Sequence, residues 1–287
     1  MLANKPKLLT VGEFLWDNFP DGRRLGGAPG NVACIAAALG ADAHLISAVG
    51  DDPDGHEALA ILIEKGVNTG LVSILPGVPT GTVTVEMDKE KGHTFTIDFP
   101  AAWDHIAVTK ETETHLKQAD ALVFGTLGQR TEAAKAATAE IINLTPPDCI
   151  RLCDANFRPP YDDHNLLDGL LKRSTAVKIN DEELVAYAPG QSPESFFQTH
   201  GHLNLLIYTR GPHGAKVLRR TNTGIEEVDH PGLEVDVVDT VGAGDSFTAT
   251  LLVSLLNREP LQTSVEKAIN IAAHVCTKQG ATPPLPT

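Results

Sequence analysis

The sequence has no apolar run long enough to cross a membrane, and its N-terminus lacks the basic-then-apolar pattern of a secretion signal. Positive charge is also scarce: 23 Lys and Arg stand against 37 Asp and Glu, which gives a net charge of −14 at pH 7. That balance argues against nucleic acid or an anionic membrane as a partner. We therefore expect a cytoplasmic protein that binds neither. Any nucleotide triphosphate would have to be met by local positive features and a metal ion.

Cysteine is scarce as well, with four residues in the chain. Cys34 and Cys276 lie in helical apolar patterns, and Cys149 and Cys153 flank a strand without the C-x-x-C spacing of zinc or redox sites. The 11 histidines are scattered without the spacing of metal ligands. We expect structural roles for the four cysteines, as small core residues.

Two nucleotide-binding signatures are absent. No G-x-x-x-x-G-K-[ST] occurs, so the chain is not a P-loop protein, and no G-x-G-x-x-G follows the first strand. The second absence leaves a dinucleotide-dependent dehydrogenase without support.

Short apolar runs alternate along the chain with helical patterns. The runs are Leu8–Val11, His44–Val49, Ala121–Phe124, Ile150–Asp154, Ala176–Ile179 and Leu205–Tyr208, and the helical patterns include residues 55–65, 131–143 and 181–187. This alternation predicts an α/β fold with a mainly parallel sheet and helices on both faces. Because no repeat or linker interrupts the 287 residues, we expect a single domain over 1–287.

One stretch follows a different pattern. Residues 82–87 and 93–99 alternate polar and apolar side chains around a turn at 88–92, which predicts a β-hairpin. A hairpin needs further strands for stability, so we expect residues 12–25 to add one and to form a small β lid with residues 80–104. The apolar side of the lid must cover something, either a substrate pocket or the lid of a second subunit, and its exposed edge invites pairing with a second chain. We therefore expect the lid to close over a bound substrate, and a homodimer through the lid is the second expectation. The apolar side consists of Val83, Val85, Phe95 and Ile97.

The most informative segment is residues 239–247, Asp-Thr-Val-Gly-Ala-Gly-Asp-Ser-Phe, which opens a helical pattern. A helix N-terminus offers free backbone N–H groups and the positive end of a dipole, and glycines allow close approach of a ligand. Phosphate is the commonest anion at such a site. Asp245 would repel a merely bound phosphate, but it could take the proton of an attacking hydroxyl, as phosphoryl transfer to an alcohol requires. The alternative is an ordinary helix cap.

A second glycine-rich segment, residues 25–33, reads Leu-Gly-Gly-Ala-Pro-Gly-Asn-Val-Ala and also opens a helical pattern. Together the two segments resemble the two signatures of the ribokinase (PfkB) family of carbohydrate kinases, and the resemblance extends over nearly the whole chain. With Val11-Gly12-Glu13 and Asp17, the pattern is most similar to the fructokinase branch. The resemblance implies a ribokinase-like three-layer sandwich with a small β lid, and an ATP-dependent sugar kinase acting first on fructose.

The resemblance also assigns roles to the anion loop. Asp245 becomes the general base, and the N–H groups of Gly242, Ala243 and Gly244 hold the charge that develops on the phosphoryl group. Some relatives bind K⁺ beside this loop, and Asp239 would be its side-chain ligand here.

Four residues are implied as sugar contacts. Asp17 would hydrogen-bond two hydroxyls, although it could instead be a turn residue near Pro20-Asp21-Gly22. Gly27 would act through close backbone approach and Asn31 through its amide, with an N-cap as the alternative for Asn31. Arg158, from an Asp-x-Asn-x-Arg motif, would meet sugar hydroxyls or a phosphate, and a salt bridge to Asp154 is its alternative.

Further motifs concern the nucleotide and Mg²⁺. Asn180 to Glu183 resembles the family's Asn-x-x-Glu, which implies that Glu183 binds Mg²⁺ through water, although the same pattern is a capping box. Thr209, Gly211 and Gly214 resemble a Thr-x-Gly-x-x-Gly loop that meets ATP, where Arg210 replaces an apolar residue. The tail around Gly280 resembles the segment beside adenine.

Two other functions compete with a fructokinase. A 2-keto-3-deoxygluconate kinase must bind a carboxylate, for which Arg23, Arg24 or Arg158 could serve, and ribokinase and adenosine kinase come further behind. In a different class stands a non-catalytic sugar-sensing protein on the same fold. Such a protein should have lost the base or the glycines, and both are present.

Overall fold

The computed structural model describes residues 5–88 and 92–286, without the side chains of residues 85–95. Its main sheet has nine strands in the order β13-β12-β11-β10-β9-β8-β1-β4-β5. The strands are β1 (Lys7–Val11), β4 (Asp42–Gly50), β5 (Val72–Leu75), β8 (Ala121–Gly125), β9 (Ile150–Asp154), β10 (Ala176–Asn180), β11 (Leu205–Thr209), β12 (Ala215–Thr221) and β13 (Gly224–His230). Seven of them pair in parallel, and β12 and β13 add an antiparallel edge.

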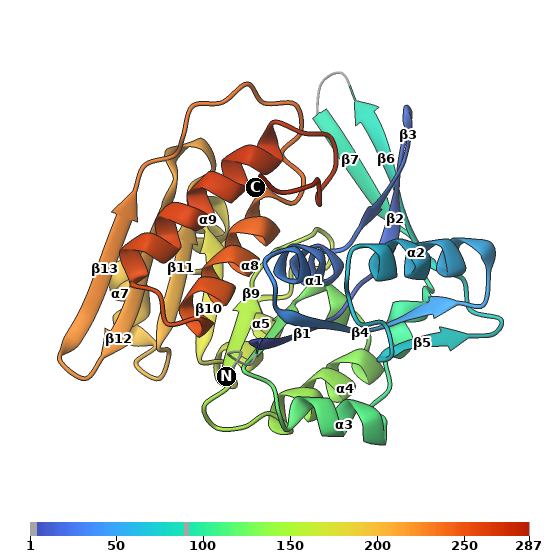
Figure 1. The fold of residues 1–287 in the computed structure, drawn as a ribbon, viewed down its shortest axis with the longest axis horizontal. Helices are drawn as coiled ribbons and strands as arrows, with labels where there is room; N and C mark the ends of the chain where they lie inside the picture. The colour runs from blue at the N-terminus through green and yellow to red at the C-terminus, as the bar shows by residue number, and fades with distance from the viewer. Residues whose placement is uncertain (1–4, 89–91, 287) are drawn as a thin grey trace.

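Helices cover both faces of this sheet, which confirms the predicted three-layer α/β sandwich (Figure 1). On one face lie α1 (Ala28–Ala38), α2 (Pro53–Glu64), α8 (Ala243–Leu256) and α9 (Leu261–Cys276). On the other lie α3 (Lys110–Leu116), α4 (Glu132–Asn143), α5 (His164–Leu171), α6 (Asp181–Tyr187) and α7 (Pro193–Thr199). None of the helices in the described residues is both long and apolar enough to span a membrane.

The core is built from the apolar strand runs. Residues such as Leu9, Leu122 and Val177 are fully buried, because strands of a parallel sheet are covered on both faces. All four cysteines are free thiols. Cys149 precedes β9 and Cys153 lies within it rather than beside it.

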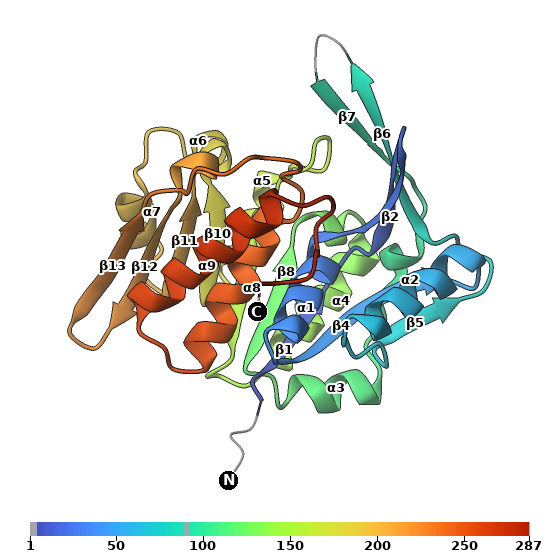
Figure 2. The ribbon, with the colours of Figure 1, turned by 45° about the horizontal axis from the view of Figure 1, so that its top comes forward.

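The predicted small β lid is confirmed as a four-stranded sheet in the order β3-β2-β6-β7. Its strands are β2 (Leu15–Phe19), β3 (Gly22–Gly26), β6 (Gly81–Asp88) and β7 (Gly92–Ile97). Residues 12–25 thus supply two strands rather than one, and Figure 2 shows the β6–β7 hairpin projecting away from the main sheet. Leu15 and Val83 form a small buried cluster with Phe19 and Ile97. The side chains of Val85 and Phe95, and the turn at 89–91, lie outside the described residues.

Candidate active site

The predicted site residues meet at the carboxyl ends of the parallel strands. The chain runs from β1 to β4 and β5 on one side and then to β8 and the later strands on the other, so the winding direction reverses between β1 and β8. Ligands of open α/β sheets bind at such a switch point, outside the carboxyl ends. Asp154 ends β9, Asn180 ends β10 and Thr209 ends β11, and each faces this edge.

The first turn of α8 leaves backbone donors free. Gly242 is the N-cap with φ 79°, and a Cβ there would lie 2.6 Å from backbone and side-chain atoms of Ala281, so only glycine fits. The Ala243 N–H donates to the Thr240 carbonyl at 3.3 Å. Within the described residues, the N–H groups of Gly242, Gly244 and Asp245 have no hydrogen-bond partner. Three unpaired donors at a helix N-terminus suit an anion.

Asp245 lies in this turn and joins the two glycine-rich segments. The Asn31 Nδ2 donates to the Asp245 Oδ2 at 2.8 Å, across 214 positions of sequence. Asn31 is inside α1, whose N-cap is Gly27, so the N-cap alternative for Asn31 is wrong. Burial raises the pKa of Asp245 to about 6, and the charge of Asp154 adds to this. A carboxylate with such a pKa can accept a proton near neutral pH.

Gly27 packs closely against the Glu13 backbone, and its predicted approach to a sugar stays a prediction. Its φ is 98°, and a Cβ on it would lie 2.5 Å from the Glu13 carbonyl oxygen. The Glu13 side chain is itself buried, and its Oε2 has no hydrogen-bond partner among the described residues. Burial raises the pKa of Glu13 to about 7, and the charge of Asp245 adds to this. Glu13 therefore belongs to the same electrostatic environment as the candidate base.

A buried ion pair lies beside the anion loop, and only one of its two residues, Asp154, belongs to a motif recognised in the sequence. The Lys178 Nζ donates to the Asp154 Oδ1 at 2.9 Å, and the two residues are register partners on β10 and β9. The salt bridge suggested between Arg158 and Asp154 is therefore wrong. A lysine inside the otherwise apolar run Ala176–Ile179 indicates a buried charge, but it does not identify Asp154 as the partner.

Asp17 is a strand residue rather than a turn residue. It lies in the middle of β2, opposite Arg24 on β3 and Val83 on β6, so the turn alternative is wrong. Its carboxylate accepts no hydrogen bond from the described residues, and burial raises its pKa to about 6 while the charge of Arg158 lowers it. An unpaired carboxylate on the lid remains free to accept hydrogen bonds from a ligand.

Three arginines were candidates for binding a substrate carboxylate. Arg23 pairs with Asp54 and Glu57 on α2, and Arg24 pairs with Asp21. The exposed Arg158 donates to the Phe157 carbonyl, and no described carboxylate lies within 4 Å of it. Arg158 is thus the one of the three whose charge is not already paired within the described part of the chain.

Glu183 forms the capping box that the sequence allowed. Its N–H donates to the Asn180 Oδ1 at 2.7 Å, and its Oε2 accepts from the Asn180 N–H at 2.8 Å. The Oε1 accepts from the Phe157 N–H at 3.1 Å, so the carboxylate is held from both sides. Burial raises the pKa of Glu183 and the charge of Lys178 opposes it.

The nucleotide-loop candidates follow β11 in a compact turn. The Arg210 N–H donates to the Gly214 carbonyl at 2.8 Å, and a Cβ on Gly214 would lie 2.1 Å from the His230 carbonyl oxygen. The Arg210 guanidinium pairs with Asp229 on β13 at 2.5 Å. The arginine that replaces an apolar residue is therefore already engaged within the protein.

Asp239 ties the anion loop to the C-terminal tail. Its Oδ1 accepts from the Val241 N–H and its Oδ2 from the Gly280 N–H, both at 3.0 Å. Both oxygens keep a second lone pair. The predicted K⁺ role of Asp239 stays a prediction.

Metal ligands do not cluster among the described side chains. Across residues 5–84 and 96–286, no group of three or more His, Cys, Asp or Glu side chains is arranged to hold a metal. Mg²⁺ in nucleotide sites is held largely by phosphates and water. The fixed Glu183 carboxylate, with a lone pair left on each oxygen, fits a contact to metal-bound water.

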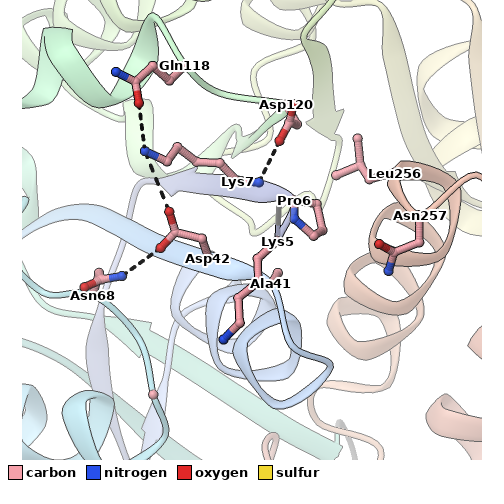
Figure 3. Close-up of a pocket in the computed structure, with 11 residues that line it drawn as sticks. Lys5, Pro6, Lys7, Ala41, Asp42, Asn68, Gln118, Asp120, Leu256 and Asn257 are labelled. Carbon is pink, nitrogen blue, oxygen red and sulfur yellow. Dashed lines mark hydrogen bonds and ion pairs between the residues drawn. The ribbon is translucent and has the colours of Figure 1, made fainter. Parts of the chain in front are cut away.

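A cavity of about 770 Å³ opens at the opposite end of the sheet (Figure 3). It is lined by residues at the amino ends of the strands, among them Lys7 and Asp42. The Lys7 Nζ lies 3.7 Å from the Asp42 Oδ2 and 3.3 Å from the Gln118 Oε1, and the Lys7 N–H donates to Asp120. Because these polar groups pair with one another far from Asp245, the cavity is not the candidate active site.

Comparison with known proteins agrees with this geometry. The family model for pfkB family carbohydrate kinases matches residues 21–287. The chain is 30% identical to a fructokinase of Klebsiella pneumoniae over 98% of this chain and 96% of that protein. It is 29% identical to probable fructokinase-5 of Arabidopsis thaliana over 100% and 96% of the two chains.

Solved structures show the same fold. A fructokinase of Vibrio cholerae with bound fructose, ADP and calcium has a TM-score of 0.82 at 24% identity, over 98% of this chain and 96% of that chain. A sugar kinase of Pyrococcus horikoshii in complex with ATP has a TM-score of 0.81 at 24% identity, over 97% and 95%.

Proposed function

The chain belongs to the pfkB family of carbohydrate kinases, and we propose that it transfers the γ-phosphoryl group of ATP to fructose, giving fructose 6-phosphate. The observation that carries the proposal is Asp245, a half-buried carboxylate with a raised pKa beside three unpaired N–H donors. The fructokinases among the relatives support fructose as the first sugar to test.

The proposed reaction uses Asp245 as general base. Its carboxylate takes the proton of the sugar hydroxyl as that oxygen attacks the γ-phosphorus, and the bond from phosphorus to ADP breaks. The free N–H groups of Gly242 and Gly244 hold the charge on the phosphoryl oxygens. The Ala243 N–H joins them only if it leaves the Thr240 carbonyl, to which it donates at 3.3 Å in this structure.

The sugar is proposed to bind between the lid and the first turn of α8. Asp17 accepts hydrogen bonds from two hydroxyls, and Gly27, Asn31 and Arg158 line the same space. Lid closure would shield the phosphoryl group from water. We also propose that two lids pair in a homodimer, which a monomer mass in light scattering would contradict.

The nucleotide is proposed to bind along the carboxyl ends of β10 and β11. Asn180 and Thr209 are register partners there, and Gly211, Gly214 and Gly280 border the same edge. Mg²⁺, when bound, would supply positive charge that offsets the charge of the phosphates. Glu183 would orient water on that ion, and Asp239 would be the K⁺ ligand.

An ADP-release assay over a panel of sugars tests the proposed function. Fructose should give the highest kcat/KM and a stoichiometric sugar phosphate. Binding of sugar with no ADP release for any sugar would instead favour the non-catalytic sugar-sensing protein.

A second substrate is favoured by Arg158. No described carboxylate lies within 4 Å of its guanidinium, which therefore could pair with the carboxylate of 2-keto-3-deoxygluconate. The panel should include this acid. If it outperforms fructose, and Arg158→Met abolishes that preference, the kinase acts on the sugar acid.

Glu183→Gln is expected to raise the Mg²⁺ concentration for half-maximal activity by about 10-fold, because outer-shell groups orient metal ligands. Sugar affinity should stay nearly unchanged. A Mg²⁺ titration of initial rates measures the shift, with the exposed neighbour Glu182→Gln as control. An unchanged titration with a lower melting temperature would mean that Glu183 serves only as a helix cap.

A further inference from the structure

Lys178 is a charged side chain in a place where burial is costly. It lies on β10, near the centre of the sheet, and only 6% of it is exposed. Burial by itself lowers the pKa of Lys178, but the charges of Asp154 and Glu183 outweigh it and raise that pKa, so the ammonium is charged at neutral pH. A buried ion pair contributes little net stability, because desolvation offsets the attraction. Stability alone is therefore a weak reason for this lysine.

The ammonium lies against the anion loop. A Cβ on Gly244 would be 3.5 Å from the Lys178 Nζ and 3.5 Å from its Cε, so the lysine head contacts the first turn of α8. This end of a helix carries partial positive charge. A cation placed there is repelled by the helix unless an anion joins them, and Asp154 is the only described carboxylate within 4 Å of the Nζ.

The Lys178 ammonium also has N–H groups without a hydrogen-bond partner among the described residues. It carries three N–H groups, and one donates to Asp154. The other two N–H groups of the nearly buried Lys178 ammonium have no partner among the described residues. The ammonium contacts the same turn that carries the unpaired N–H groups of Gly242 and Gly244. All of these donors belong to or contact the first turn of α8, which carries Asp245, so a phosphoryl group bound at that turn would meet them.

We propose that the Lys178 ammonium contacts the terminal phosphoryl group of ATP and stabilises its charge during transfer, while Asp154 acts as a positioning residue that holds the ammonium in place. The inference rests on the proposed function. Lys178 gives up no proton in the step: the hydroxyl proton goes to Asp245, the new bond joins the sugar oxygen to phosphorus, and the electron pair of the broken bond stays on ADP.

The test compares Lys178→Met with a matched control, Lys7→Met. Lys7 and Asp42 are also register partners on adjacent parallel strands, but at the amino ends of the sheet (Figure 3). Binding of Mg·AMP-PNP and of ADP is measured by calorimetry, and turnover with the best sugar by ADP release. Because Lys178→Met leaves Asp154 unpaired, the double variant Asp154→Asn/Lys178→Met is measured as well, with its melting temperature.

Lys178→Met and the double variant should bind Mg·AMP-PNP at least about 10-fold more weakly, with ADP affinity within about twofold of wild type. Their kcat should fall by about 10²–10³-fold, as for loss of one preorganised donor to a transition-state oxyanion. Lys7→Met should change none of these by more than about twofold. A structural role would instead lower the melting temperature and weaken both nucleotides equally.

The failures of the two proposals are distinguishable. If wild-type protein phosphorylates a sugar but the folded lysine variants keep kcat within threefold, or lose ADP and AMP-PNP affinity alike, the role of Lys178 is overturned and the kinase function stands. If wild-type protein binds neither nucleotide, both the proposed function and the proposed role of Lys178 are contradicted.

Discussion

Asp245→Asn is expected to lower kcat by about 10²–10⁴-fold, the usual cost of removing a general base. The amide has the same shape as the carboxylate, and its oxygen can still accept from the Asn31 Nδ2, so the fold and nucleotide affinity should persist. Steady-state kinetics with saturating ATP and sugar measure the loss. Glu132→Gln, an exposed acid in the first turn of α4, is the control. More than about a tenth of the wild-type kcat would contradict the assignment.

The raised pKa of Asp245 also predicts how activity and stability depend on pH. A base must be ionised, so kcat/KM should fall as pH drops below about 6, and more steeply than for one proton because the pKa of Asp17 is also about 6. Stability changes in the opposite sense. A folded pKa near 6 exceeds the unfolded value of 3.8, so the folded state loses stability as pH rises from about 4 to 6.

The Asp245→Asn variant should not lose stability in this way as the pH rises, because its amide does not titrate. At pH 8 we expect Asp245→Asn to have a higher free energy of unfolding than wild type, by on the order of 1–3 kcal/mol, and therefore a higher melting temperature. Near pH 4 the two proteins should be equally stable. Thermal unfolding at the two pH values measures this difference. A variant less stable than wild type at pH 8 would show that the carboxylate is structural.

Asp17→Ala should reduce kcat/KM for the sugar by about 10²–10⁴-fold. Two hydrogen bonds to a charged group are lost, each contributing about 1.5–3 kcal/mol. The KM for ATP should change by less than about threefold, because the nucleotide is proposed to bind along β10 and β11 rather than on the lid. Separate titrations of sugar and ATP measure the two effects.

Asn18→Ala is the matched control for this experiment. Asn18 is the next residue on β2, and successive side chains of a strand point to opposite faces. It should leave both KM values within about twofold. Equal increases in both KM values for Asp17→Ala would mean that Asp17 holds the lid together rather than the sugar.

The sequence predicted six of the seven parallel strands, because those six are short apolar runs, and it missed the seventh, β5. It missed β12 and β13, where charged residues interrupt the pattern: Lys216 pairs with Glu194 and Glu227, and Arg219 with Glu226. In this antiparallel part of the sheet one face stays solvated while the other packs, so hydrophobicity alone does not reveal the strands.

Site residues in local motifs could be predicted from the sequence. Contacts that depend on strand register or on the packing of distant helices could not. The glycines before Asp245 predict a helix N-terminus from a segment of only a few residues. The pair of Lys178 with Asp154 depends on the alignment of β10 with β9, and the bond from Asn31 to Asp245 joins two helices distant in sequence. Neither contact leaves a trace in residue spacing.

The C-terminal tail limits how the protein can be handled. Its Gly280 is hydrogen-bonded to Asp239, its Ala281 lies against Gly242, and the Thr282 carbonyl accepts from the Lys65 Nζ at 2.8 Å. We therefore expect an affinity tag or fluorescent protein fused at this end to disturb the loop that is proposed to bind phosphate. A purification tag at the other end of the chain is expected to disturb nucleotide binding less.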